Sequence, residues 1–355
     1  MNIPSSEAIK YLRVIMGHNK AKGLIAQLEF RKWVKSNLGI AAQKHFEGCW
    51  ILPAKELPYS RRVCFFVNTT INLHDQLDET VKQLVGDKGF RGLCSSLKAT
   101  GLGVVYYIAT SDSRPNIDRL KWTGYFYSKD ILVPLDETKT YKEWGGPGHP
   151  SKARTEWEPA TKETYSALSQ EEVTAILLPQ VFYNKVLKQN FRISTPDPYD
   201  CDGFIVSDDG KVFPLEIKEK SPIEGKTKKY GIDARRLLML LRVCLPLDAN
   251  AFYIIRELES GGTRKFSKWV FISLDDMIMK SSWNLMSGGT GMGGGGTSTI
   301  ILPYSAFSDV TTDAFSDDAL RSLSPLTGKV KQQAIKFARE IEGRLYQRAT
   351  LKLGS

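Results

Sequence analysis

The pattern of hydrophobic and polar positions changes along the chain. In residues 5–45 apolar residues recur at roughly helical spacing, which predicts a helical start. From Cys49 onward the pattern becomes short runs rich in β-branched and aromatic residues, which are typical of strands separated by polar turns. These runs are "RVCFFVNTTI", "GVVYYIATS" and "GYFYSKDILVPL". We therefore expect residues 1–145 to form an α/β domain.

Residues 146–165 interrupt this pattern. The stretch is rich in glycine, proline and charge and has no period, so it is either a linker or a long loop within one domain. The regular pattern that follows predicts a second domain over residues 166–355. This domain is expected to begin with the helix "SQEEVTAILLPQVFYNKVLKQNF", capped by Ser169 and Glu172 and bent at Pro179.

The second domain is expected to continue with two strands, a helix and two more strands. The first two strands, near 201–206 and 211–219, are separated by "SDDG", in which Gly210 suits the left-handed position of a three-residue hairpin loop. In that register Asp202 lies across from Glu216, and Lys218 lies on the same face as Glu216 because side chains on a strand alternate. Charged side chains in the otherwise apolar "VFPLEI" indicate a site.

The residue types at this hairpin indicate metal chemistry. Two converging carboxylates repel each other unless a cation lies between them, and oxygen ligands without histidine or cysteine favour Mg²⁺, with Mn²⁺ as a substitute. A nearby lysine can hold a water or balance the charge of a phosphate. This combination is suited to metal-assisted hydrolysis of a phosphodiester.

Asp202, Glu216, Ile217 and Lys218 together resemble the motif of the PD-(D/E)XK nuclease superfamily, over about residues 165–275. The resemblance implies a restriction-endonuclease-like core, in which a mixed sheet is flanked by helices, with the N-terminal α/β domain as an addition. It also implies that Asp202 and Glu216 bind the metal, that Lys218 orients the attacking water, and that Glu172 or Glu171 assists from the preceding helix. The "PD" element departs from the pattern, because "PDPYDCD" leaves Asp200 eligible beside Asp202.

Charge and composition point to a polyanionic partner. The net charge is +10, and residues 1–160 hold 23 Lys and Arg against 16 Asp and Glu. Basic residues also follow the hairpin and are expected to contact the phosphates of double-stranded DNA. They are Lys220, Lys226, Lys228, Lys229, Arg235 and Arg236. Five dispersed cysteines, the lack of a secretory signal and the absence of a long apolar run predict a cytoplasmic protein without membrane association.

Two other sequence features are interpreted as structural. The glycine-rich stretch around Gly289–Gly294 matches GxGxxG formally, but a strand-like run follows it where a dinucleotide site needs a helix, so no nucleotide cofactor is expected. The amphipathic C-terminal helix from about Lys329 either packs on its own domain or forms a homodimer.

The sequence as a whole favours a sequence-specific type II restriction endonuclease. The alternatives are a phage or repair nuclease that reads DNA structure or ends, an inactive nuclease fold that only binds DNA, and an enzyme with another substrate.

Overall fold

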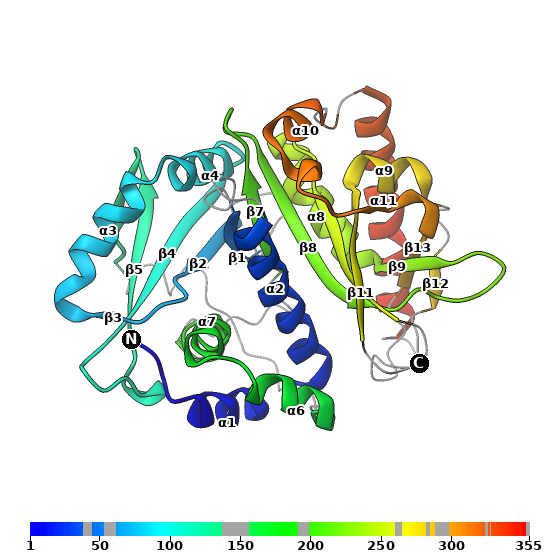
Figure 1. Ribbon diagram of the computed structural model, residues 1–355. Helices are drawn as coiled ribbons and strands as arrows, with labels where there is room; N and C mark the ends of the chain where they lie inside the picture. Colours follow the sequence, from blue (N-terminus) through cyan, green and yellow to red (C-terminus); the bar gives the residue numbers. More distant parts are fainter. Residues whose placement is uncertain are drawn as a thin grey trace. The chain divides into compact units, whose positions relative to one another are not determined.

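The computed structural model divides the chain into two compact units (Figure 1). The N-terminal unit comprises Met1–Trp33 and Phe46–Cys201, and the C-terminal unit comprises Val34–His45 and Asp202–Ser355. The structure describes residues 1–37, 45–52, 62–136, 156–190, 199–259, 265–281, 285–287, 298–323, 326 and 328–352. Within these ranges no helix is both long and apolar enough to cross a membrane.

The N-terminal unit combines helices with a mixed, mostly antiparallel sheet. Strand β2 pairs antiparallel with β1 and parallel with β4, and β4 continues antiparallel to β5 and β6. The helices are α1 (Ser5–Ile15), α2 (His18–Asn37), α3 (Leu77–Gly86), α4 (Lys88–Ala99), α6 (Pro159–Ser166) and α7 (Gln170–Val181). The strands are β1 (His45–Leu52), β2 (Arg62–Val67), β3 (Asn72–Leu73), β4 (Leu102–Ser111), β5 (Lys121–Ser128) and β6 (Ile131–Pro134). Helices α3, α4 and α6 are additional to the predicted elements, and α6 lies largely within the stretch that was expected to be a linker or long loop.

Helix α7, which was expected to open the second domain, packs in the N-terminal unit. Its buried residues Val173 and Leu177 join the same apolar cluster as Leu12 of α1. The predicted start of the helix is confirmed, because Ser169 and Glu172 form a reciprocal capping box. Past Val181 the backbone continues as a π-helix, η4 (Phe182–Asn190). The two units therefore divide between Cys201 and Asp202, later than the expected linker, of which residues 146–155 lie outside the described residues.

From β7 to β11 the C-terminal unit follows the predicted order of elements, with β9 as an extra strand, and α9, β12, β14 and α10 are further elements that were not predicted. Its sheet has the order β14-β11-β10-β8-β7, in which β8 is antiparallel to β7 and parallel to β10. Strands β9, β13 and β12 form a smaller antiparallel sheet. The strands are β7 (Tyr199–Val206), β8 (Val212–Lys220), β9 (Lys229–Asp233), β10 (Phe252–Leu258), β11 (Phe266–Ser273), β12 (Leu285–Ser287), β13 (Ser298–Pro303) and β14 (Ser308–Asp309). The helices are α8 (Ala234–Leu247), α9 (Leu274–Lys280), α10 (Asp317–Ser322) and α11 (Gly328–Lys352).

The sheet and its helices enclose the core of the C-terminal unit. Every residue of β8 from Val212 to Ile217 is buried, as expected for a central strand that is covered on both faces. The ring of Phe252 in β10 packs against Phe213 and Phe315. Helix α11 packs against α8 and α9 and buries Phe337, which confirms packing on its own unit. Residues 288–297, in the glycine-rich stretch, lie outside the described residues, and the strand predicted to follow is β13.

The hairpin between β7 and β8 has the predicted loop and register. Gly210 has a φ of 80°, and the amide of Ser207 donates to the carbonyl of Lys211 at 3.0 Å. The ladder pairs Gly203 with Leu215, so Asp202 and Glu216 occupy the next positions in the same register. A shift of one residue would send the side chains of β8 to opposite faces, and the loop therefore sets which residues reach the site.

Replacing Gly210 by alanine should destabilise the protein through backbone strain alone. A Cβ at this position meets no atom within 4 Å, but a non-glycine residue in the left-handed region costs about 1 kcal/mol. We expect Gly210→Ala to lower the free energy of unfolding by that amount in urea denaturation. Gly225→Ala is the matched control, since a Cβ there would meet the carbonyl of Thr227 only at the ordinary van der Waals distance of 3.8 Å and Gly225 needs no positive φ. Equal effects of the two substitutions would contradict the assigned loop.

Candidate active site

Three charged side chains of the C-terminal unit converge beside β8. The ammonium nitrogen of Lys218 lies 3.1 Å from Asp202 Oδ2 and 2.8 Å from Glu216 Oε1. Asp202 comes from β7, and Glu216 and Lys218 come from one face of β8. The structure thus brings together the residues that the hairpin register selects, with the lysine bridging the two carboxylates.

Both carboxylates are withdrawn from solvent, whereas the lysine is not. The side chains of Asp202 and Glu216 are 1% and 0% exposed, and that of Lys218 is 29% exposed. Asp202 Oδ2 also accepts a hydrogen bond of 2.7 Å from the amide of Ile217. A buried carboxylate is tolerated only when it is paired and hydrogen-bonded, and these contacts provide that for Asp202.

Glu216 lacks the hydrogen bonds that its burial calls for. Within the described part of the chain neither of its oxygens accepts a hydrogen bond, and the approach of Lys218 to Oε1 has the distance of an ion pair without the geometry of a hydrogen bond. A second cation is near, with Arg236 Nε 3.9 Å from Glu216 Oε1. A fully buried polar group without a partner is rare in proteins and calls for an explanation, such as a ligand that completes it.

These residues fit a hard divalent cation. The orphaned oxygens of Glu216 and the nearby Asp202 offer only carboxylate donors, which Mg²⁺ prefers. Among the described residues, no group of three or more histidine, cysteine, aspartate or glutamate side chains is arranged to hold a metal. The protein would therefore supply two ligands, and Mg²⁺ commonly takes one or two carboxylates and completes its shell with water and substrate phosphates.

A second lysine extends the same face of the strand. Lys220 follows Lys218 by two residues, and its ammonium donates to the backbone carbonyl of Gly231 in β9. Burial, and to a smaller extent the positive charge of Lys218, lowers the pKa of Lys220 to about 8, although Glu216 and Asp233 act in the opposite direction. Lys220 was expected to contact DNA phosphates, but its ammonium is engaged with the backbone inside the unit.

Tyr253 closes the site on the side of β10. It pairs with Glu216 in the parallel ladder and donates from its hydroxyl to the carbonyl of Gly231 at 3.1 Å. Burial raises the pKa of Tyr253 well above its usual value, and the charges of Glu216 and Asp202 add to the shift. Its hydroxyl therefore remains a hydrogen-bond donor. Sequence reasoning missed both Tyr253 and Gly231, because β9 was not predicted.

The other basic residues lie on the segment after β8 and at the start of α8. Lys226, Lys228 and Lys229 are exposed on the extension that joins β8 to β9 (Figure 1). Two backbone hydrogen bonds between Ile223 and Lys229 close this extension, which we call the basic hairpin (residues 221–229). Arg235 lies in the first turn of α8, directly before the arginine that approaches Glu216.

Glu172, which the resemblance suggested as a further catalytic residue, is occupied in the N-terminal unit. Its Oε2 accepts from the amide of Ser169 at 2.7 Å, and its Oε1 lies 2.6 Å from Lys32 Nζ. Glu172 therefore caps helix α7 with one carboxylate oxygen and pairs with Lys32 through the other. Asp200, the alternative first ligand, is half-buried in β7.

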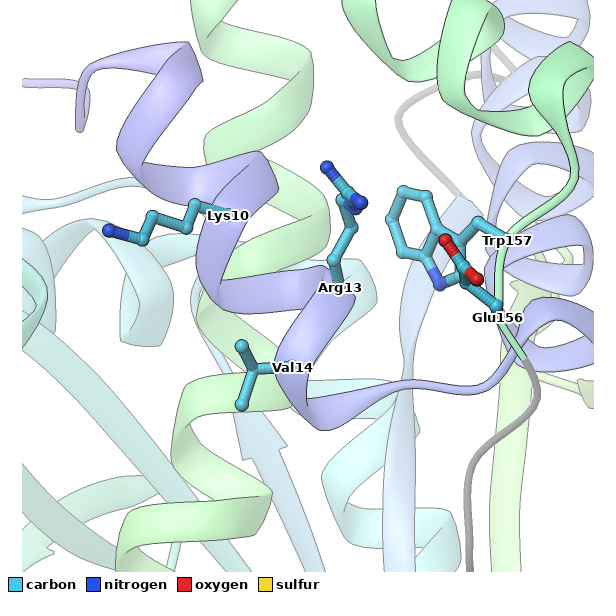
Figure 2. A pocket seen from close by; sticks show the side chains of 5 residues that line it. All are labelled: Lys10, Arg13, Val14, Glu156 and Trp157. Atoms are coloured by element: carbon cyan, nitrogen blue, oxygen red, sulfur yellow. The ribbon is translucent and has the colours of Figure 1, made fainter.

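A surface pocket of about 350 Å³ lies in the N-terminal unit. It is lined by Lys10, Arg13, Val14, Glu156 and Trp157 (Figure 2). Arg13 points toward the indole, whereas Lys10 points away from it. The indole nitrogen of Trp157 donates to the carbonyl of Met16, so the ring is held in place. The charged residues of this pocket are exposed, and no orphaned group in it calls for a ligand.

Comparison with known proteins identifies no relative. No protein-family model, curated protein or solved structure matches the chain. The site is therefore interpreted from its own residues.

The depressed pKa of Lys220 predicts a stability that depends on pH. Its pKa in the folded protein, about 8, lies below the ordinary value of 10.5, so the unfolded chain binds more protons between these values. The free energy of unfolding should rise with pH in this window, by at most about 1.4 kcal/mol per pH unit. Lys220→Met removes the buried charge, so its stability relative to the wild type should be greatest near pH 7 and should fall toward pH 10. Urea denaturation across this range measures the difference, and a difference that does not change with pH would refute the assignment.

Proposed function

We propose that the protein is a Mg²⁺-dependent deoxyribonuclease of the PD-(D/E)XK type, acting as a type II restriction endonuclease. The observation that carries the proposal is Glu216, a carboxylate that is fully buried, accepts no hydrogen bond and meets Asp202 at a shared lysine. The ion pairs with Lys218 and Arg236 offset the charge of Glu216, but they leave the hydrogen-bonding capacity of its oxygens available to a ligand.

Each residue of the site has a role in this proposal. Asp202 and Glu216 would hold the cation, with the amide of Ile217 fixing the orientation of Asp202. When bound, Mg²⁺ or Mn²⁺ would supply an activated water and neutralise charge that develops on the phosphate. Lys218, which is partly exposed and contacts both carboxylates, would orient the attacking water and balance the phosphate charge. Arg236 lies close enough to Glu216 to contribute positive charge at the same phosphate.

The proposed reaction is hydrolysis of the bond between phosphorus and the 3′ oxygen. Water attacks phosphorus, the bond to the 3′ oxygen breaks, and that oxygen takes up a proton. The products are a 5′-phosphate and a 3′-hydroxyl. A palindromic target would require a homodimer or two successive nicks, because one site cuts one strand.

The DNA duplex would be held mainly through its phosphates. The basic hairpin continues directly from β8, which carries Glu216 and Lys218, so its exposed lysines are suited to contact the backbone beside the cleaved bond. Most of the excess positive charge lies in residues 1–160, which we propose contribute target recognition. Such an enzyme would belong to a restriction–modification pair, in which a methyltransferase protects the host DNA.

DNA cleavage tests the proposal directly. Unmethylated phage and plasmid DNA, incubated with Mg²⁺, should yield discrete fragments that disappear with EDTA. Glu216→Gln and Lys218→Ala should each reduce cleavage at least roughly 10³-fold, as loss of a group that stabilises the transition state does. Lys211→Ala, on the loop side of the same hairpin, is the control and should cleave normally.

The form of the products separates the remaining functions. A Mg²⁺-dependent smear that needs Glu216 would indicate a nuclease directed by DNA structure or ends. DNA binding without cleavage on any of these substrates would point to an inactive binding module, and neither binding nor cleavage would contradict a nucleic-acid function.

The contribution of the basic hairpin should appear in the salt dependence of DNA binding. Replacing Lys226, Lys228 and Lys229 by alanine should weaken binding and reduce the slope of log K against log salt concentration by up to about 3, since each phosphate contact contributes about 0.9. Fluorescence anisotropy of a labelled duplex measures the slope. Alanine at Lys265, Lys280 and Lys331, which are ion-paired to other acidic residues, is the matched control. An equal loss of slope in both triple variants would show that the hairpin has no special role.

A further inference from the structure

Lys218 occupies the position between the two carboxylates of the site. Its ammonium is within 3.1 Å of Asp202 and 2.8 Å of Glu216, so the charge that relieves their repulsion is already provided by the protein. A divalent cation bound by the same two carboxylates would need the same place. The ammonium and the cation therefore compete.

The charges of the four side chains that pair with one another at the site are balanced before any ligand arrives. When all four groups are ionised, the negative charges of Asp202 and Glu216 equal the positive charges of Lys218 and Arg236. Addition of a divalent cation would leave an excess of two positive charges in a largely buried place, which is unfavourable at low dielectric. A phosphodiester and a hydroxide would each bring one negative charge and would restore the balance.

Lys218 is also the member of the cluster that is best able to move. The carboxylate of Asp202 is buried and held by the amide of Ile217, and Glu216 is fully buried in the central strand. Lys218 has a flexible four-carbon stem, and 29% of its side chain is exposed. A phosphate oxygen of DNA would give its ammonium a new partner outside the pair of carboxylates.

We propose that Lys218 is an internal counter-ion that makes metal binding depend on DNA: the free protein binds a divalent cation weakly, and the phosphate backbone draws the ammonium away and admits the cation. This inference rests on the proposed nuclease function and adds a regulation of the same site. Because coupling between two ligands is reciprocal, the cation should strengthen DNA binding by the same factor. Such coupling would keep the hydrolytic centre incomplete until a phosphodiester is in place.

Binding of Mn²⁺, measured by electron paramagnetic resonance, tests the inference without relying on turnover. In the wild type, a phosphorothioate duplex, which resists hydrolysis, should tighten Mn²⁺ binding about tenfold or more, the range of typical couplings between sites. Lys218→Met should bind Mn²⁺ about tenfold more tightly than the wild type without DNA, and the duplex should add little. Lys218→Arg keeps the charge and should retain the weak binding of the wild type. Lys211→Met, which loses a lysine paired with Asp209 on the same hairpin, should not differ from the wild type.

The outcomes separate this inference from the proposed function. If Glu216→Gln abolishes Mn²⁺ binding but Lys218→Met binds no more tightly than the wild type, the counter-ion role is wrong and the metal site stands. If Glu216→Gln leaves Mn²⁺ binding unchanged with and without DNA, the metal site is wrong and both proposals fail. Should Lys218→Met not fold, the wild type decides alone, because equal Mn²⁺ affinity with and without the duplex overturns the coupling.

Discussion

Burial of a carboxylate in a central strand is the constraint around which the C-terminal unit is organised. Glu216 lies between β7 and β10 in a strand whose neighbouring residues are apolar and buried. The penalty for burying an unpaired charge is several kcal/mol, so the surroundings must offset it. Lys218 and Arg236 do so through charge, since no described residue donates a hydrogen bond to either oxygen of Glu216. The charge of Glu216 is thus offset by nearby cations, while its oxygens keep the capacity to accept hydrogen bonds or to bind a ligand.

The fold brings the residues of the site together through one local connection and one long-range connection. The tight hairpin loop at Gly210 sets the register that places Asp202 next to the strand position of Glu216. The crossover from β8 through α8 to the parallel strand β10 brings Arg236 and Tyr253 to the same place from residues further along the chain. A parallel pair requires such a crossover, so the topology itself delivers a helix beside the acidic residues.

The parts of the site that were predictable are those decided by local rules. A three-residue loop with glycine and the two-residue period of a strand suffice to bring Asp202, Glu216 and Lys218 together. Lys220 follows the same alternation, but its environment depends on β9, whose pairing with β13 joins segments nearly 70 residues apart. Its sequence context therefore resembled that of the exposed lysines that follow it, and only the fold distinguishes them.

The limits of sequence reasoning in the N-terminal unit have the same origin. The capping box of α7 was readable because its two partners are three residues apart, and it is present in the structure. The unit to which α7 belongs is decided by apolar contacts with α1, which are more than 150 residues away in the chain. The sequence alone supports two interpretations of Glu172, as a helix cap or as a residue that assists catalysis. A glutamate at the start of a helix has the same sequence signature in both cases.

Two ionisable groups beside the two carboxylates, Lys220 and Tyr253, have shifted pKa values. Burial lowers the pKa of Lys220 and raises that of Tyr253, so both groups are shifted toward their uncharged forms. Both also donate to the carbonyl of Gly231, which ties β8 and β10 to the edge of the smaller sheet. With these two groups held in place, Lys218 is the charged group that is both partly exposed and in contact with both carboxylates. The ion pairs through which Lys218 offsets the repulsion between the two carboxylates are therefore the contacts that the proposed metal binding would have to break.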